Sequence, residues 1–246
     1  TGSTMVGKLV MAAAAPQLTP LTLELGGKSP CLIAPDMPVA TAVERMIFGK
    51  SLNAGQICVA PDYVLLPRSE VDNFIAAYRR HFSKLYPQGL NSADYGAIIN
   101  DRQYQRLVSW LDEAEQAGAQ LHPCGSPARD DQRRLLVPHL LTEVPGHCQV
   151  MQQEIFGPLL PLVPYDSLDE ALAYIAARPR PLAFYLMSLD PALQSRLIRE
   201  THAGGMAINE CLFQVAADDA PFGGIGPSGM GHYHGYEGFL TFSKAK

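Results

Sequence analysis

The chain has 246 residues, of which 47% are hydrophobic and 17% are charged, and its net charge is −5. This composition is typical of a globular protein of one or two domains with a large core, and it excludes a disordered chain. The negative charge gives no indication of nucleic acid or an anionic membrane surface as a partner. No apolar run reaches the roughly 18 residues of a membrane-spanning helix, so we expect no membrane span.

Short apolar segments alternate along the chain with amphipathic ones. In chain order, the pattern predicts a helix over 4–15, strands over 22–25 and 31–34, a helix over 38–53, a strand over 63–66, helices over 70–85 and 102–117, strands over 135–141 and 159–163, a helix over 168–177, a strand over 184–189, a helix over 192–200 and a last core strand over 206–209. This order favours an α/β fold, with a mostly parallel sheet flanked by helices on both faces.

The amino-acid composition of the chain changes after about residue 212. Residues 221–231 are too rich in glycine for regular structure, and 236–246 are expected to end the chain as an extended strand. Gly224-Ile-Gly226-Pro-Ser-Gly229 matches the dinucleotide fingerprint literally, but Pro227 and the short remainder leave no room for the helix that the motif requires. We therefore interpret it as a structural loop.

The five cysteines, at positions 31, 58, 124, 148 and 211, are odd in number and form no Cys-x-x-Cys pair. In a chain of this size the pattern indicates the reduced thiols of an intracellular, cytoplasmic protein rather than a disulfide framework. Four of them are expected to be small buried hydrophobic side chains.

Cys58 differs from the other four because it ends the segment Asn53-Ala-Gly-Gln-Ile-Cys58, directly after a predicted helix. Gly55 lets the backbone approach a substrate closely, and such a turn leaves N–H groups free for a developing oxyanion. The sequence therefore offers Cys58 as a nucleophile, with burial as a small hydrophobic residue as the alternative. Since the thiolate is the reactive form, we expect a depressed thiol pKa or an adjacent base.

Glu24 ends an apolar strand just before two glycines, 34 residues upstream of Cys58. A carboxylate in such a place suits proton transfer; the alternative is a cap for the next element or a partner for Lys28. Gly2 and Ser3 open the first helix and offer N–H groups to a phosphate, although an ordinary N-cap is the commoner meaning. His232 and His234 have no cysteine or carboxylate cluster at zinc spacing, so no metal is expected.

Three segments together resemble the aldehyde dehydrogenase superfamily, in that family's order: Leu23-Glu-Leu-Gly-Gly-Lys28, Asn53-Ala-Gly-Gln-Ile-Cys58 and Gln152-Gln-Glu154-Ile-Phe156-Gly-Pro158. The resemblance implies an oxidoreductase that converts an aldehyde to a carboxylic acid with NAD or NADP through a cysteine thioester. It implies Cys58 as the nucleophile and Glu24 as the base that activates the hydrolytic water. The implied cofactor contacts are Gly2 and Ser3 at the pyrophosphate, Leu25 under the nicotinamide ring through its backbone, Glu154 on the nicotinamide ribose and Phe156 near the ring.

Within that superfamily, further short segments of the sequence are most similar to the class 3 and coniferyl aldehyde dehydrogenase branch. The segments that carry this are Ala60-Pro-Asp-Tyr63, Ile98-Ile-Asn-Asp101, Pro221-Phe-Gly-Gly224, Gly231-His-Tyr-His-Gly235 and Phe239-Leu-Thr-Phe-Ser243. The branch implies an aromatic, coniferyl-type aldehyde as substrate and a homodimer or homo-oligomer of the full-length protein. Tyr63, Phe213 and Tyr233 are candidates for an aromatic-lined tunnel, with core or loop packing as the alternative.

The resemblance also implies that the family's oxyanion-hole asparagine and adenosine-binding residues lie upstream of Thr1. We therefore expect a C-terminal fragment that is inactive alone. Residues 1–25 would be a rim of the cofactor-binding domain, 26–228 the catalytic (nucleophile) domain, and 229–246 a tail that could serve as an oligomerisation strand. The alternative is a non-catalytic remnant of the same fold that acts as a binding or oligomerisation module.

Overall fold

The body of the protein is a seven-stranded sheet in a computed structural model that describes residues 1–244. The strand order is β10-β9-β2-β3-β8-β7-β4, and every neighbouring pair is parallel except β4 with β7. The strands are β2 (Pro30–Ile33), β3 (Tyr63–Pro67), β4 (Gln120–Pro123), β7 (His139–Thr142), β8 (Leu159–Tyr165), β9 (Ala183–Met187) and β10 (Gly205–Ile208). The predicted α/β fold with a mostly parallel sheet is confirmed.

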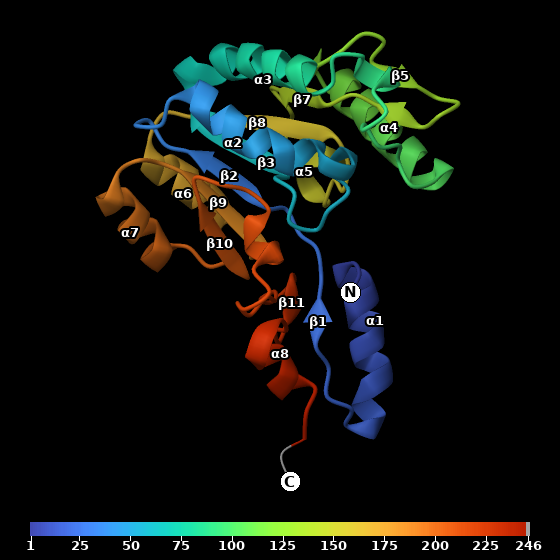
Figure 1. The fold of residues 1–246 in the computed structure, drawn as a ribbon, viewed down its shortest axis with the longest axis vertical. Coiled ribbons are helices and arrows are strands. Elements are labelled where there is room, and N and C mark those ends of the chain that lie inside the picture. Colours follow the sequence, from blue (N-terminus) through green and yellow to red (C-terminus); the bar gives the residue numbers. More distant parts are fainter. Residues whose placement is uncertain (245–246) are drawn as a thin grey trace.

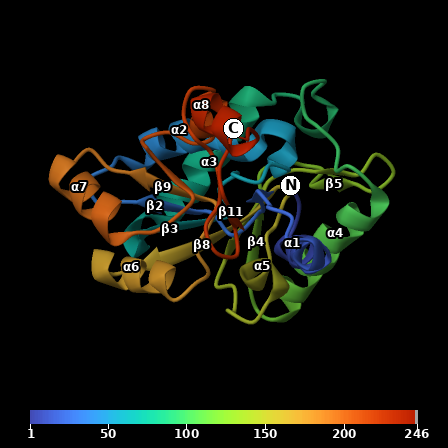
Figure 2. The same cartoon turned by 90° about the horizontal axis from the view of Figure 1, so that it is seen from below.

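Helices cover both faces of this sheet (Figures 1 and 2). One face packs against α2 (Val39–Ser51), α3 (Val71–Leu85) and α4 (Asp101–Gln116), and the other against α6 (Leu168–Ala176) and α7 (Pro191–Glu200). Side chains alternate along a strand, so Cys31 joins the larger core beneath α2 while its neighbour Leu32 joins the smaller core with Leu197 of α7. No helix of residues 1–244 has the length and hydropathy needed to cross a membrane.

The two ends of the chain form an arm below the sheet, made of α1 (Thr4–Ala14), β1 (Leu23–Glu24), β11 (Gly229–Met230) and α8 (Gly235–Thr241) (Figure 1). β1 and β11 pair antiparallel, with Glu24 opposite Gly229. Gly229 has φ of 142°, and a Cβ there would overlap the carbonyl oxygen of Leu23. Only glycine permits this approach, which fixes the backbone of Glu24 beside the glycine-rich loop.

Three of the expected elements are wrong. The strand predicted over 135–141 is divided into β6 (Leu135–Leu136) and β7, because Pro138 lies between them and cannot donate to a ladder. The supposed last core strand, β10, lies at the sheet edge and is half-buried. The expected tail strand is contradicted by α8, and residues 245–246 lie outside the described residues.

Besides the short 3-10 helices, four short elements were not anticipated: β4, β5 (Arg129–Asp130), which pairs with β6, α5 (Gln149–Gln152), and β11, which lies in the glycine-rich segment expected to lack regular structure. Each is four residues or fewer, and β4 and β5 are largely polar. Segments of this length do not carry a full hydrophobic period, which explains why the sequence pattern missed them.

Candidate active site

The segments that carry Glu24, Cys58 and Glu154 lie near the amino-terminal edge of the parallel strands. Lys28 lies two residues before β2, Asp62 directly before β3, and Glu154 five residues before β8. β2, β3 and β8 are consecutive neighbours in the sheet, so their preceding loops meet at one edge. The arm places Glu24 next to the same edge, because Gly26 and Gly27 lead from β1 directly to Lys28.

A left-handed turn delivers Cys58 to this edge. After α2 ends, Asn53, Ala54 and Gly55 have φ of 51°, 52° and 73°, a conformation that costs L-residues free energy and suits glycine. A Cβ on Gly55 would also lie 2.5 Å from the carbonyl oxygen of Gly157. The glycine noted in the sequence is therefore required both by the turn and by the contact with the loop after Glu154.

The side chain of Gln56 holds the turn in place. Its Nε2 donates to the carbonyl oxygens of Asn53 at 2.9 Å and Ala97 at 3.1 Å, while its Oε1 accepts from the N–H of Ile99 at 2.9 Å. Gln56 is itself buried. The position of Cys58 is thus fixed by contacts with the segment that precedes α4.

The Cys58 side chain faces two carboxylates. Burial raises the pKa of the Cys58 thiol to about 12, and interactions with the Glu24 carboxylate and the charge of Glu154 act in the same direction. Only its own backbone N–H acts to lower the pKa. The expectation of a depressed thiol pKa is therefore wrong for this chain, and a base must remove the proton.

Of the two carboxylates, Glu24 has the larger effect on the thiol. Its side chain is 4% exposed, and its Oε1 is buried without a hydrogen-bond partner among the described residues. Its backbone carbonyl accepts from the N–H of Gly2 at 3.1 Å. Cys58 is partly exposed, whereas Cys31, Cys124, Cys148 and Cys211 are buried, as the sequence predicted.

Glu154 borders a cavity of about 640 Å³ together with the N-terminus of α1. Burial and the charge of Asp62 raise the pKa of Glu154 to about 7, against the opposing effects of the Gly27 N–H and of Lys28. Its Oε1 has no hydrogen-bond partner in residues 1–244. The cavity is lined by Ser3, Thr4, Met5, Gly26, Gly27, Lys28, Met151, Gln152, Gln153, Glu154, Ala177, Arg178, Pro179, Arg180 and Pro227.

Ser3 also serves as an ordinary helix cap, because its Oγ accepts from the N–H of Val6 at 3.3 Å. Gly2 and Leu25 form a parallel bridge behind the cavity, and the Leu25 N–H donates to Ser228 O at 2.9 Å. Phe156 is 41% exposed with φ of 46°. The structure therefore brings Ser3 and Glu154 to one cavity, while Gly2, Leu25 and Phe156 are outside its lining within residues 1–244.

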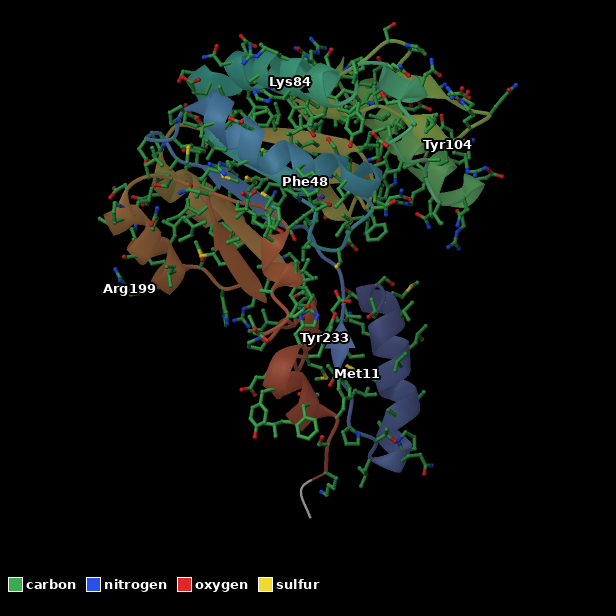
Figure 3. The ribbon with its side chains drawn as sticks, in the orientation of Figure 1. Met11, Phe48, Lys84, Tyr104, Arg199 and Tyr233 are labelled. Carbon is green, nitrogen blue, oxygen red and sulfur yellow. The ribbon has the colours of Figure 1, made fainter. Side chains whose placement is uncertain are left out.

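The aromatic candidates lie in three different environments. Tyr63 is 1% exposed in the smaller core, where it packs edge-on against Tyr174, so of its two predicted roles the structure supports core packing. Phe213 is 57% exposed and stacks on Phe48 of α2 with ring centroids 6.2 Å apart. Tyr233 lies in the arm (Figure 3), and its pKa is raised by burial and by the charges of Glu24 and Cys58.

Sequence reasoning missed several charged residues around the site. Lys50, in the last turn of α2, is 1% exposed, and burial lowers its pKa to about 8 against the opposing charge of Asp62. Asp62 lies within the quoted Ala60-Pro-Asp-Tyr63 segment but had no assigned role. Arg106, on α4, reaches the carbonyl oxygen of Ile155 at 2.6 Å, and its helical spacing gave no signal of this contact.

The comparisons with known proteins agree on one family. A family model described as the aldehyde dehydrogenase family matches residues 1–246. A probable coniferyl aldehyde dehydrogenase of Pseudomonas aeruginosa is 55% identical over all of this chain and 51% of its own length. A dimeric NADP-preferring aldehyde dehydrogenase of Mus musculus is 43% identical over 99% of this chain and 52% of its own length.

The comparison with solved structures identifies the same family. A substrate-bound structure of Staphylococcus aureus AldH superposes with a TM-score of 0.92 at 45% identity, over 98% of this chain and 52% of that one. The chain thus spans about half the length of the curated relatives that it matches.

Proposed function

The chain belongs to the aldehyde dehydrogenase family, and on that premise we propose that the complete protein oxidises an aldehyde to the carboxylic acid with NAD or NADP. Cys58 acts as the nucleophile and Glu24 as the base. The observation that carries the proposal is the partly exposed thiol facing a buried carboxylate whose Oε1 has no partner in the described residues.

The reaction follows from that pair. Glu24 takes the thiol proton, and the Cys58 sulfur attacks the aldehyde carbon to form a thiohemiacetal. An oxidised nicotinamide cofactor, when bound, would supply the hydride acceptor for this carbon, and Cys58 would then hold the acyl group as a thioester. Glu24 releases the first proton to solvent and then takes a proton from water. The water oxygen adds to the thioester carbon, and the C–S bond breaks to release the acid, while the proton on Glu24 returns to the Cys58 sulfur.

The residues around the cavity fit the nicotinamide cofactor. The partnerless Oε1 of Glu154 suits a ribose hydroxyl, which donates a hydrogen bond. Ser3 and Thr4 open α1, and the N–H groups at a helix N-terminus suit the negative pyrophosphate. Gly2, Leu25 and Phe156 complete the proposed cofactor contacts.

The proposed substrate is an aromatic, coniferyl-type aldehyde. The 55% identity to the coniferyl relative supports it, as do the exposed Phe48–Phe213 stack and Tyr233 beside Glu24. The proposed assembly is a homodimer, from the likeness to a dimeric relative. The cytoplasm is the proposed location, since all five cysteines are free thiols.

The proposed organisation remains that of the sequence analysis, with residues 1–25 as a rim of the cofactor domain, 26–228 as the catalytic domain and the tail from 229. Met5 and Leu9 on α1 are 70% and 65% exposed, so α1 presents apolar side chains at the surface. Loss of one oxyanion donor alone weakens transition-state stabilisation by roughly 2.7–4 kcal/mol. The 246-residue chain is therefore proposed to be inactive by itself.

The test compares the complete gene product with the 246-residue chain, by absorbance of reduced cofactor with coniferyl aldehyde, benzaldehyde and hexanal. We expect turnover by the complete protein, fastest with coniferyl aldehyde, and none by its Cys58→Ala variant. No turnover by the complete protein would refute the function. Clear turnover by the short chain would refute the argument about the fragment.

The non-catalytic alternative is favoured by one observation, the half-buried edge strand β10, since a free strand edge invites pairing with another chain. A complete protein that forms stable assemblies but turns over none of the three aldehydes would support it.

A further inference from the structure

Two opposite charges sit at matching positions behind the two proposed catalytic residues. Lys28 lies four residues after Glu24, and Asp62 lies four residues after Cys58. The Nζ of Lys28 and the Oδ2 of Asp62 form an ion pair whose side chains are only 13% and 4% exposed. The pair therefore joins the segment of the base to the segment of the nucleophile.

The same pair holds the backbone around Glu154. Lys28 Nζ donates to the carbonyl oxygens of Val150 at 2.8 Å and Gln153 at 3.0 Å. The Oδ1 of Asp62 accepts from the N–H of Ile155 at 2.8 Å. Of the two peptide groups that adjoin Glu154, one is thus hydrogen-bonded to Lys28 and the other to Asp62.

Arg106 holds this loop from α4. Its Nη2 donates to the Ile155 carbonyl at 2.6 Å and its Nη1 to the Glu154 carbonyl at 3.4 Å. The guanidinium stacks on Trp110 at 4.3 Å, which fixes its own position. The loop is therefore clamped between the sheet edge and α4.

Glu24 and Cys58 do not depend on the pair in this way. The backbone of Glu24 is held by β11 and by Gly2, and the turn before Cys58 by Gln56. Loss of the pair should therefore move the Glu154 loop more than it moves the two catalytic side chains.

Burying two charges is unfavourable unless both are paired and fully hydrogen-bonded, so such a pair is weak support for stability. We propose that Lys28 and Asp62 are a positioning pair that holds Glu154 at the distance from Cys58 required for cofactor binding. This inference rests on the proposed function for the role of Glu154, although the positioning itself does not.

The enzymatic test uses Asp62→Asn and Lys28→Met in the complete gene product. Asparagine keeps an acceptor for Ile155 but removes the charge, and methionine removes both carbonyl contacts. The matched control is Asp166→Asn, which breaks the exposed Arg68–Asp166 pair, whose side chains are 58% and 67% exposed. Lys28→Arg tests rescue by a conservative change.

Two activities separate positioning from general damage. Hydrolysis of p-nitrophenyl acetate requires only Cys58 and Glu24: the thiolate displaces p-nitrophenolate, and water then releases acetate from the thioester. We expect the KM for the cofactor to rise at least tenfold in both pair variants, while the rate of ester hydrolysis stays within threefold of wild type. The cofactor KM of Lys28→Arg should lie between that of the wild type and that of Lys28→Met. An unchanged cofactor KM, or an equal loss of both activities, would overturn the inference.

A second measurement does not need catalysis. In the 246-residue chain, amide hydrogen exchange at Ile155 should be at least tenfold faster in Lys28→Met, faster by a smaller factor in Asp62→Asn, which keeps an acceptor for this N–H, and unchanged in Asp166→Asn. Unaltered exchange at Ile155 in both pair variants overturns the positioning even if the proposed function is correct. Faster exchange supports the positioning even if the wild type oxidises no aldehyde.

Discussion

A substitution at Gly26 can test cofactor binding separately from the chemistry of the Cys58 thiol, because it should weaken cofactor binding without disturbing the thiol. A Cβ built on Gly26 would overlap both carboxylate oxygens of Glu154, whereas the nearest atom to a Cβ on Gly27 is 3.7 Å away. Neither glycine has a left-handed φ, so the backbone accepts alanine at both positions. Gly27→Ala is therefore a matched control one residue away.

The magnitude follows from the displaced carboxylate. Ordinary carbon contacts lie near 3.5–4.0 Å, so Glu154 must withdraw by more than ~1 Å in Gly26→Ala, which breaks a hydrogen bond to the ribose. A hydrogen bond to a charged group contributes about 1.5–3 kcal/mol, and this corresponds to a loss of about 10- to 150-fold in cofactor affinity. Since Glu154 can rotate away, the unfolding free energy should change by less than ~1 kcal/mol.

The assay is the KM for NAD and NADP in the complete gene product, with p-nitrophenyl acetate hydrolysis measured in parallel. We expect Gly26→Ala to lose cofactor affinity and to retain ester hydrolysis, while Gly27→Ala resembles the wild type in both. Equal cofactor KM values in the two variants would refute the reasoning.

Two further predictions concern pH. Because burial and Glu24 raise the Cys58 pKa to about 12, iodoacetamide labelling of Cys58 should accelerate about tenfold per pH unit up to pH 10; a plateau near pH 8 contradicts this. The raised pKa of Glu154, about 7, contributes stability that is fully present below its unfolded pKa and is lost as pH rises through 7. Glu154→Gln should therefore match the wild type in urea unfolding at pH 4 and exceed it by ~2 kcal/mol at pH 8, a value reduced for partial exposure; equal unfolding free energies at pH 8 would count against it.

The fold was accessible from the sequence wherever a segment carried a full hydrophobic period. The amphipathic pattern over 70–85 predicted α3 to within one residue, and the apolar runs predicted β2, β3 and β8. The pattern failed where a single residue or the sheet topology decides. Pro138 interrupts an otherwise continuous apolar run, and nothing local distinguishes the edge strand β10 from a core strand.

The site was accessible in part, since the segments around Glu24, Cys58 and Glu154 do converge on one sheet edge. The electrostatics were accessible only as two alternatives, a depressed thiol pKa or an adjacent base, because the thiol pKa depends on burial and on carboxylates that arrive from distant segments. The Lys28–Asp62 pair was invisible for the same reason: its importance lies in the carbonyls and the N–H of a third segment. The roles of the seven proposed site residues stay predictions.

The most direct test of the account is to trap the acyl group. The Glu24→Gln form of the complete gene product would be treated with p-nitrophenyl acetate and examined by intact-mass and peptide mass spectrometry. Because Glu24 also takes the thiol proton, the account expects an acetyl adduct that forms more slowly than in the wild type but persists on the peptide carrying Cys58. This adduct turns over in the wild type and is missing in Cys58→Ala. An adduct on another residue, or wild-type turnover by Glu24→Gln, would contradict it.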